Sequence, residues 1–333
     1  MSTSVPSTLA RGARLGLTAL ALAGAASLTA HADDKVTVIN TWFAQAEHGG
    51  PYQALATGIY KKYGLDVTVK MGGPQVNGVQ LLLADQADFV MSYDFTILQG
   101  VEKGFPLVTI AAPLQFDMQG LMTHDDVKSL SDLKDKTILV AGSNTTSWWP
   151  WFKQKYGYTD AQMRPYTFNL QPFFADKNIA QQAFPSSEPY QAQQAGAKVK
   201  FFLFADFGYP PYTQAITTTQ KTIADKPDVV ARFVKATAEG WKSFLENPAP
   251  AAELIKKANP NMTDGQIAYG VERMKEMKVI TGGDAARLGI GTMSDERWKK
   301  TAEYMIGAGL LKPTTDWKKA YTTQFVKDLR VMP

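Results

Sequence analysis

The sequence contains no cysteine and only three histidines among its 333 residues. The lack of cysteine excludes disulfides, thiol nucleophiles and thiolate metal ligands. Two of the histidines, His48 and His124, lie beyond the N-terminal segment and stand in different sequence contexts. A histidine metal site is therefore not expected, although carboxylates could still supply ligands, and we predict neither a metal nor a cofactor.

Sequence signatures of catalysis are also missing. The chain has no G-x-S-x-G, no H-E-x-x-H and no Walker loop. Gly72-Gly73-Pro74 follows an expected strand, but its spacing differs from the glycine fingerprint of dinucleotide sites. We therefore predict no catalytic residues.

A strong charge of one sign is absent as well. The chain has 35 Lys and Arg against 31 Asp and Glu, a formal charge of +4. Without Arg11 and Arg14, which precede the expected mature chain, the formal charge falls to +2. So small a positive excess does not favour binding of nucleic acid.

The N-terminus has the pattern of an export signal. Arg11 and Arg14 precede an apolar run over 15–28, and Ala30-His31-Ala32 forms a small-x-small cleavage site. We predict a signal peptide over 1–32, cleaved near Ala32, with a retained membrane anchor as the alternative. No lipid-anchor cysteine follows it, so we expect a free, soluble product in the periplasm without direct membrane insertion.

The rest of the chain alternates between strands and helices. Such alternation predicts an α/β fold with open, mostly parallel sheets flanked by helices. The expected strands are 35–39, 65–70, 89–91, 106–112, 137–141, 199–204 and 215–219. The expected helices include 51–63 and 148–156, the second capped by Ser147 or Thr146. A long helix is expected from Pro227, with Trp241 on its buried face.

A change of character near residue 119 indicates a second lobe inserted into the first. We expect lobe 1 over 33–118 and 216–333, and lobe 2 over 119–215. Two chain crossings make a hinge, so segments near 118 and 216 are expected side by side. Loops at the strand ends of both lobes then face a ligand cleft at the hinge.

The loop after the first strand is the main candidate for ligand contact. Trp42 can stack, Gln45 and His48 can form hydrogen bonds, and Gly49 lets backbone N–H groups approach a ligand at a helix N-terminus. The alternative interpretation is that Trp42 belongs to the core and that His48 only caps the helix.

Polar and aromatic residues follow other expected strands. Trp148 and Trp149 are adjacent, so only one of them is expected to face the cleft, and Glu188 is placed on a loop held by Pro189. Each residue could instead cap a helix or line a solvated turn. The further candidates for ligand binding are Tyr93, Asp94, Gln115, Ser143, Asn144, Thr145, Trp148 and Glu188.

Several of these motifs together resemble one family. They are Trp42-x-x-Gln45-x-x-His48-Gly49-Gly50-x-Tyr52, the segment 60–67, Gly72-Gly73-Pro74 and Ser187-Glu188-Pro189. The chain resembles the nitrate/sulfonate/taurine-type solute-binding proteins of ABC importers, particularly the NMT1/THI5-like branch. The resemblance implies a two-lobed periplasmic binding protein of type II, a small-molecule ligand, and an ABC permease with its ATPase as partners; we expect a monomer.

Members of this branch that bind thiamine-pyrimidine precursors have a similar opening, Asp-Trp-x-Pro-Asn ahead of a His and a Tyr. Here Thr41, Ala44 and Gln45 replace the Asp, Pro and Asn. The resemblance implies that Glu188 corresponds to a glutamate used on the aminopyrimidine. The branch also contains eukaryotic enzymes with a cysteine-rich motif, which this chain lacks.

Three functions follow, in order of preference. The first is capture of a pyrimidine-like heterocyclic amine by lobe closure. The second is binding of an alkanesulfonate, taurine or nitrate-type anion, although none of the arginines lies in a proposed cleft loop. The third is a secreted acid–base hydrolase or lyase using Asp94, Glu188 or His48, and an orphan sensor-type receptor is a further possibility. The mature chain's arginines are Arg164, Arg232, Arg273, Arg287, Arg297 and Arg330.

Overall fold

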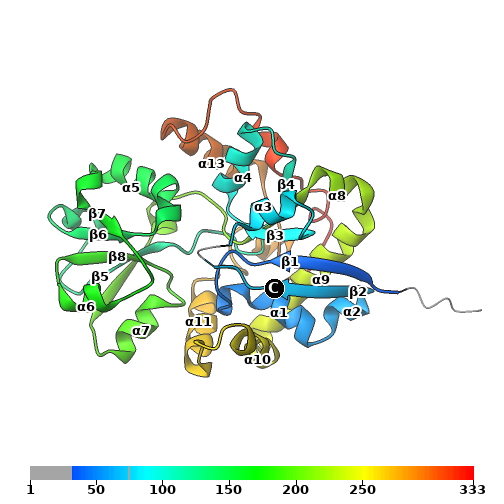
Figure 1. The fold of residues 1–333 in the computed structure, drawn as a ribbon, viewed down its shortest axis with the longest axis horizontal. Coiled ribbons are helices and arrows are strands. Elements are labelled where there is room, and N and C mark those ends of the chain that lie inside the picture. The colour runs from blue at the N-terminus through cyan, green and yellow to red at the C-terminus, as the bar shows by residue number, and fades with distance from the viewer. Residues whose placement is uncertain (1–31, 74–75) are drawn as a thin grey trace, which may run out of the picture. The chain divides into compact units, whose positions relative to one another are not determined.

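The computed structural model describes residues 32–73 and 76–333 (Figure 1). The predicted signal peptide therefore lies outside the described residues, apart from Ala32. Residues Asp33–Pro333 form one compact unit that contains two five-stranded sheets. In Figure 1 the strands of the first sheet that precede residue 112 are blue to cyan, and the second sheet is green.

The first sheet has the order β2-β1-β3-β10-β4. β1 runs parallel to β2 and β3, whereas β10 runs antiparallel to both of its neighbours. β-branched residues at alternate positions favour these strands, as expected from the sequence. The strands are β1 (Asp34–Ile39), β2 (Leu65–Lys70), β3 (Phe89–Ser92), β4 (Leu107–Ala111) and β10 (Ala215–Thr219).

The second sheet has the order β7-β6-β8-β5-β9 and again holds one antiparallel strand, β5, between two neighbours. β6 runs parallel to β7 and β8. Three of its strands were not predicted: β5, which starts with a glycine, β7, which is short and contains a proline, and β8, which contains two glutamines. The strands are β5 (Gly120–His124), β6 (Thr137–Val140), β7 (Met163–Pro165), β8 (Ile179–Ala183) and β9 (Val199–Leu203).

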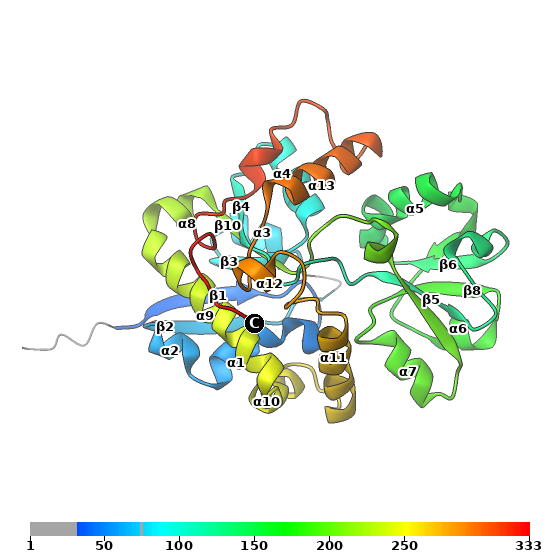
Figure 2. The same ribbon diagram turned by 180° about the vertical axis from the view of Figure 1, so that it is seen from behind.

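Helices flank both sheets, so the expected α/β class is confirmed. Figure 2 shows α9, the long predicted helix, running along the first sheet beside α1. The described α-helices are α1 (Gly49–Ala56), α2 (Ile59–Lys62), α3 (Gly78–Leu83), α4 (Asp94–Glu102), α5 (Trp148–Tyr156), α6 (Gln171–Ala175), α7 (Glu188–Gln194), α8 (Gln220–Asp225), α9 (Pro227–Glu246), α10 (Ala249–Ala258), α11 (Asp264–Glu276), α12 (Ala285–Leu288) and α13 (Asp295–Gly307).

Two local expectations were wrong. The helix expected over 51–63 is divided into α1 and α2, because Gly58 adopts a left-handed conformation with φ 74° that ends one helix and starts the next. Ser147 precedes α5, but its hydroxyl makes no capping bond and instead donates to Asn144 Oδ1 at 3.1 Å.

Each sheet has its own buried core. In the first, Phe89 stacks on Phe233 of α9 with ring centroids 4.0 Å apart. In the second, Trp148 packs on Phe204 at 4.7 Å. Trp241 is fully buried, as predicted. Complete burial of an aromatic side chain contributes about 2–3 kcal/mol each, so these rings fix the helices on their sheets.

Two extended segments connect the sheets. The backbone N–H of Asp117 donates to Pro211 O at 3.0 Å, and Leu114 pairs with Thr213 in an antiparallel bridge. The outgoing and returning crossings therefore contact each other through backbone hydrogen bonds. The exact lobe boundaries, 33–118 with 216–333 and 119–215, stay a prediction.

Candidate functional site

The loop after β1 enters α1 through the 3₁₀ helix η1 (Ala46–His48). A Cβ atom at Gly50 would lie 2.4 Å from the Trp241 ring, and one at Gly49 would lie 2.3 Å from the Phe244 ring. Both glycines are needed because α1 packs tightly on α9. The structure thus gives Gly49 a packing role, which differs from the ligand approach that the sequence analysis assigned to it.

His48 is fully buried behind this loop. Its Nε2 lies 3.3 Å from the Thr41 hydroxyl, which donates to Gln214 Oε1 at 2.8 Å. It makes no capping bond to α1. Burial lowers the pKa of His48 to about 3, so the imidazole is neutral at physiological pH and cannot act there as a general acid.

Two buried carboxylates lie near the crossings. Asp94, at the start of α4, accepts a hydrogen bond from Tyr212 N at 2.8 Å, and Asp117 accepts from Gln119 N at 2.8 Å. Burial raises the pKa of each to about 7, and the charge of Arg297 only partly offsets this. The positive charge of Arg297 therefore acts on both carboxyls, although none of the six arginines was expected in a cleft loop.

Glu188 is the first residue of α7 rather than part of a loop, because Pro189 fits the first turn of a helix. Its side chain is buried, Oε1 accepts from the Tyr166 hydroxyl at 2.8 Å, and Oε2 accepts from Phe184 N at 2.9 Å. Burial raises the pKa of Glu188. A carboxylate has about four acceptor positions, so capacity for a further donor remains.

Glu47 is a buried carboxylate that the sequence analysis missed. It lies in η1, and its Oε2 accepts a hydrogen bond from Ser186 Oγ at 3.2 Å. Burial and the neighbouring charge of Glu188 raise the pKa of Glu47 to about 7. Because Ser186 precedes α7, this bond joins the element after β1 to the element after β8.

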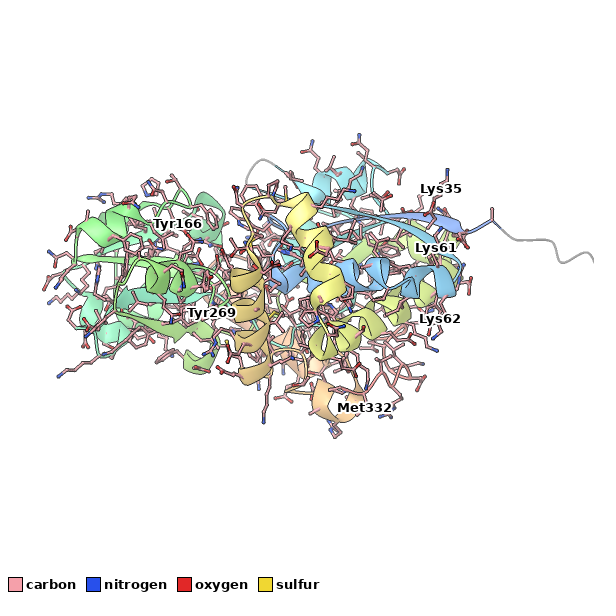
Figure 3. The ribbon with its side chains drawn as sticks, turned by 90° about the horizontal axis from the view of Figure 1, so that it is seen from below. Lys35, Lys61, Lys62, Tyr166, Tyr269 and Met332 are labelled. Carbon is pink, nitrogen blue, oxygen red and sulfur yellow. The ribbon has the colours of Figure 1, made fainter. Side chains whose placement is uncertain are left out.

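Three aromatic rings meet between the same two parts of the chain, and we call them the aromatic trio: Trp42, Phe43 and Phe168. Trp42 lies edge-on to Phe43 with centroids 5.5 Å apart and edge-on to Phe168 at 6.3 Å. Phe168 lies 6.2 Å from Tyr166, whose position beside the green sheet is labelled in Figure 3. Trp42 is half-buried, so it is not a core residue.

The other residues predicted to bind a ligand make separate contacts within the protein and do not converge on one point. Gln115 Nε2 donates to Ala112 O at 2.9 Å and to Thr292 O at 3.0 Å. The ring of Tyr93 stacks on Phe95 at 5.4 Å. Gln45 is buried, and among the described residues its Oε1 has no hydrogen-bond partner.

The candidates after β6 lie in and beyond the 3₁₀ helix η3 (Gly142–Thr146), which includes Ser143. Asn144 Nδ2 donates to Gln182 Oε1 at 3.0 Å, and Thr145 Oγ1 donates to Gly142 O at 2.7 Å. Trp148 and Trp149 are both buried in the second core, so neither indole offers a free face. The expectation that one of them faces a cleft has no support from this packing.

Trp42 and Glu188 are thus connected through Phe168 and Tyr166, two residues that sequence reasoning missed. Tyr166 and Phe168 follow β7, a strand that was not predicted because it contains a proline. Glu47 and Ser186 are sequence neighbours of predicted ligand-binding residues, and only their burial in the structure marks them as part of the site. In the described part of the chain no cluster of three or more His, Cys, Asp or Glu could hold a metal, and none of its helices is long and apolar enough to cross a membrane.

Comparison with known proteins gives the chain a family. A model of the family described as NMT1/THI5 like matches residues 45–251. The riboflavin-binding protein RibY of Chloroflexus aurantiacus is 23% identical over 302 residues, covering 88% of this chain and 86% of that protein. The formylaminopyrimidine-binding protein of Halalkalibacterium halodurans is 22% identical over 254 residues, covering 72% and 76%.

Solved structures share the fold. The periplasmic aliphatic sulphonate-binding protein SsuA of Escherichia coli aligns with a TM-score of 0.64 at 11% identity, covering 86% of this chain and 91% of that one. The desulfurization enzyme DSZB aligns with a TM-score of 0.61 at 11% identity, covering 89% and 98%. These similarities confirm the expected two-lobed periplasmic binding fold, which serves mainly binding proteins but also an enzyme.

The family model covers more than half of the chain, and the two relatives above are named for the small molecules that they bind, which fits a solute-binding role. The chain therefore belongs to the NMT1/THI5-like family.

Proposed function

We propose that this protein is the periplasmic solute-binding component of an ABC importer and that its solute is a pyrimidine-like heterocyclic amine. The mature chain begins after cleavage near Ala32, acts as a free monomer, closes its lobes on the solute and delivers it to a permease and its ATPase. The proposed contacts come from Trp42 and Glu188, with Glu47 added from the structure.

The observation that carries this proposal is the pair of buried carboxylates. Glu47 follows β1, Glu188 begins α7, and Ser186 joins the two elements through its bond to Glu47. Amino and ring N–H groups of a solute can donate to the carboxyl oxygens of Glu47 and Glu188, whereas a nitrate or sulfonate offers acceptors alone and is repelled by either acid once it ionises. The acceptor oxygens of the site therefore favour a donor-rich solute over an anion.

The aromatic trio and the relatives support the same class of solute. Flat rings bind well against aromatic side chains, and Trp42 is half-buried rather than part of either core. The relatives named for riboflavin and formylaminopyrimidine bind nitrogen heterocycles. The sulphonate-binding SsuA shares only the fold at 11% identity and supports no choice of solute.

We propose binding without catalysis. The chain has no cysteine, which removes the thiol nucleophile, and burial lowers the pKa of His48 to about 3, which makes its imidazole a weak base and no acid at neutral pH. Among the acid–base candidates named from the sequence, Asp94 and Glu188 remain, and burial raises the pKa of both. Recovery of unchanged solute after incubation supports binding alone, whereas turnover that is lost in Glu188→Gln would establish an enzyme.

Titration calorimetry on the mature protein tests the solute. The probes are 4-aminopyrimidine, riboflavin, taurine and nitrate at matched ionic strength. We expect binding of 4-aminopyrimidine and no heat from taurine or nitrate. Binding of taurine or nitrate that persists in Glu188→Gln would overturn the proposal in favour of an anion importer.

A further inference from the structure

Phe168 has an unusual backbone for an aromatic residue. Its φ is 61°, in the left-handed region that a bulky side chain rarely adopts, and its side chain is 38% exposed. Strained backbone of this kind persists where the surroundings hold it, and it is common at ligand clamps. The other described non-glycine residues with positive φ carry no aromatic ring: Asp85, Gln214, Lys278 and Arg330.

The neighbouring residues hold this conformation in place. Tyr166 N donates to Val140 O at 2.9 Å, which continues the pairing of β7 with β6, and the Tyr166 hydroxyl donates to Glu188. On the other side, Phe174 N donates to Leu170 O at 3.0 Å and anchors α6. Phe168 is therefore presented by a loop fixed at both ends.

The ring of Phe168 contacts the loop after β1 and not a core. Its centroid is 6.3 Å from Trp42 and 6.3 Å from Phe43, and among the described residues no member of the aromatic trio belongs to a hydrophobic core. Packing of either sheet therefore does not explain these rings. Their common property is that they come from the carboxyl ends of β1 and β7, where open α/β sheets bind ligands.

We infer that Phe168 is a specificity-determining residue that clamps a planar ring of the solute against Trp42, an inference that rests on the proposed solute-binding function. Two flanking rings need a separation of roughly 7 Å to hold a third at van der Waals contact. Trp42 and Phe168 now lie 6.3 Å apart with their planes at 66°, so they contact each other edge-on. Admission of a solute ring therefore requires the Phe168 ring to turn as well as to move outward, which exchanges the edge contact for face contacts that an acyclic solute cannot offer.

The test compares two probes that both carry N–H donors on an N–C–N unit, each measured against its own wild-type affinity. 4-Aminopyrimidine has a planar aromatic ring and is neutral, whereas acetamidine has no ring and is a cation at neutral pH. In Phe168→Ala we expect affinity for 4-aminopyrimidine to fall roughly tenfold, with acetamidine unchanged. Phe168→Tyr keeps the ring and is expected to keep the affinity. Phe105→Ala, which removes a phenylalanine that is 43% exposed and lies elsewhere, is the matched control.

Phe168→Gly distinguishes the loss of the ring from an effect of backbone strain, because glycine removes the ring and adopts positive φ without strain. If the ring clamps the solute, the Gly and Ala variants lose the same affinity. Full affinity in Phe168→Gly, or in Phe168→Ala, would overturn the clamp while leaving the solute-binding function intact. Failure of the wild type to bind any aromatic probe, with taurine or nitrate bound instead, would overturn the proposed function and the clamp together.

Discussion

Replacement of Glu47 by glutamine should make the protein more stable at alkaline pH. The carboxyl group is buried in η1 and bonded to Ser186, and its pKa rises from 4.5 to about 7. The folded protein thus favours the neutral acid. Its contribution to stability is fully present below about pH 4.5 and is lost as the pH rises through about 7.

The structure sets the size of the effect. One pKa unit corresponds to about 1.4 kcal/mol, so the shift of Glu47 gives a ceiling of about 3 kcal/mol between pH 4 and pH 8. Relaxation around Ser186 and Glu188 reduces this, and we expect about 2 kcal/mol. Glutamine is neutral at both pH values and can still accept the Ser186 hydrogen bond. Glu47→Gln should therefore match the wild type at pH 4 and exceed it at pH 8.

Urea unfolding followed by tryptophan fluorescence at both pH values measures the difference. Glu246→Gln, which alters an exposed glutamate at the end of α9, is the control and should show no pH-dependent change. Equal stability of Glu47→Gln and wild type at pH 8 would refute the reasoning, because the buried carboxyl would then ionise without cost.

Two further changes test the site and the packing. Glu188→Gln should weaken binding of 4-aminopyrimidine by more than tenfold in titration calorimetry, since an NH2 donor replaces one of the two acceptor oxygens, and unchanged affinity would remove Glu188 from the site. Gly50→Ala should lower the free energy of unfolding by about 2 kcal/mol, because its new Cβ would lie 2.4 Å from the Trp241 ring. Gly307→Ala, whose Cβ meets nothing within 4 Å, should be neutral or stabilising in the same urea assay.

The strands and the long helix could be predicted from sequence because their signals are local. β10 is a run of β-branched residues, and the helical spacing of apolar residues in α9 identified its buried face. The strands β7 and β8 were not predicted because the proline in β7 and the glutamines in β8 do not favour a strand. Both strands form through pairing with β6. Tertiary contacts there outweigh local propensity.

The site was less predictable because its residues meet across the chain. Nothing in the sequence near Trp42 indicates that Phe168 lies beside it. Glu47 attracts notice only once its burial and its bond to Ser186 are known. Trp148 and Trp149 were expected on different faces, but α5 carries aromatic residues around most of its circumference, so both are buried.

The position of β10 has a consequence for the order in which the molecule assembles. β10 lies between β3 and β4, and Thr217 pairs with Val90 and Thr109, so the first sheet stays split until the chain has been synthesised to that point. Closing so long a loop costs entropy and slows folding. The intervening segment, which holds β5 to β9, can form its own sheet first and bring Asp117 to Pro211. Folding of that segment then shortens the effective loop that β10 has to close when it pairs with β3 and β4.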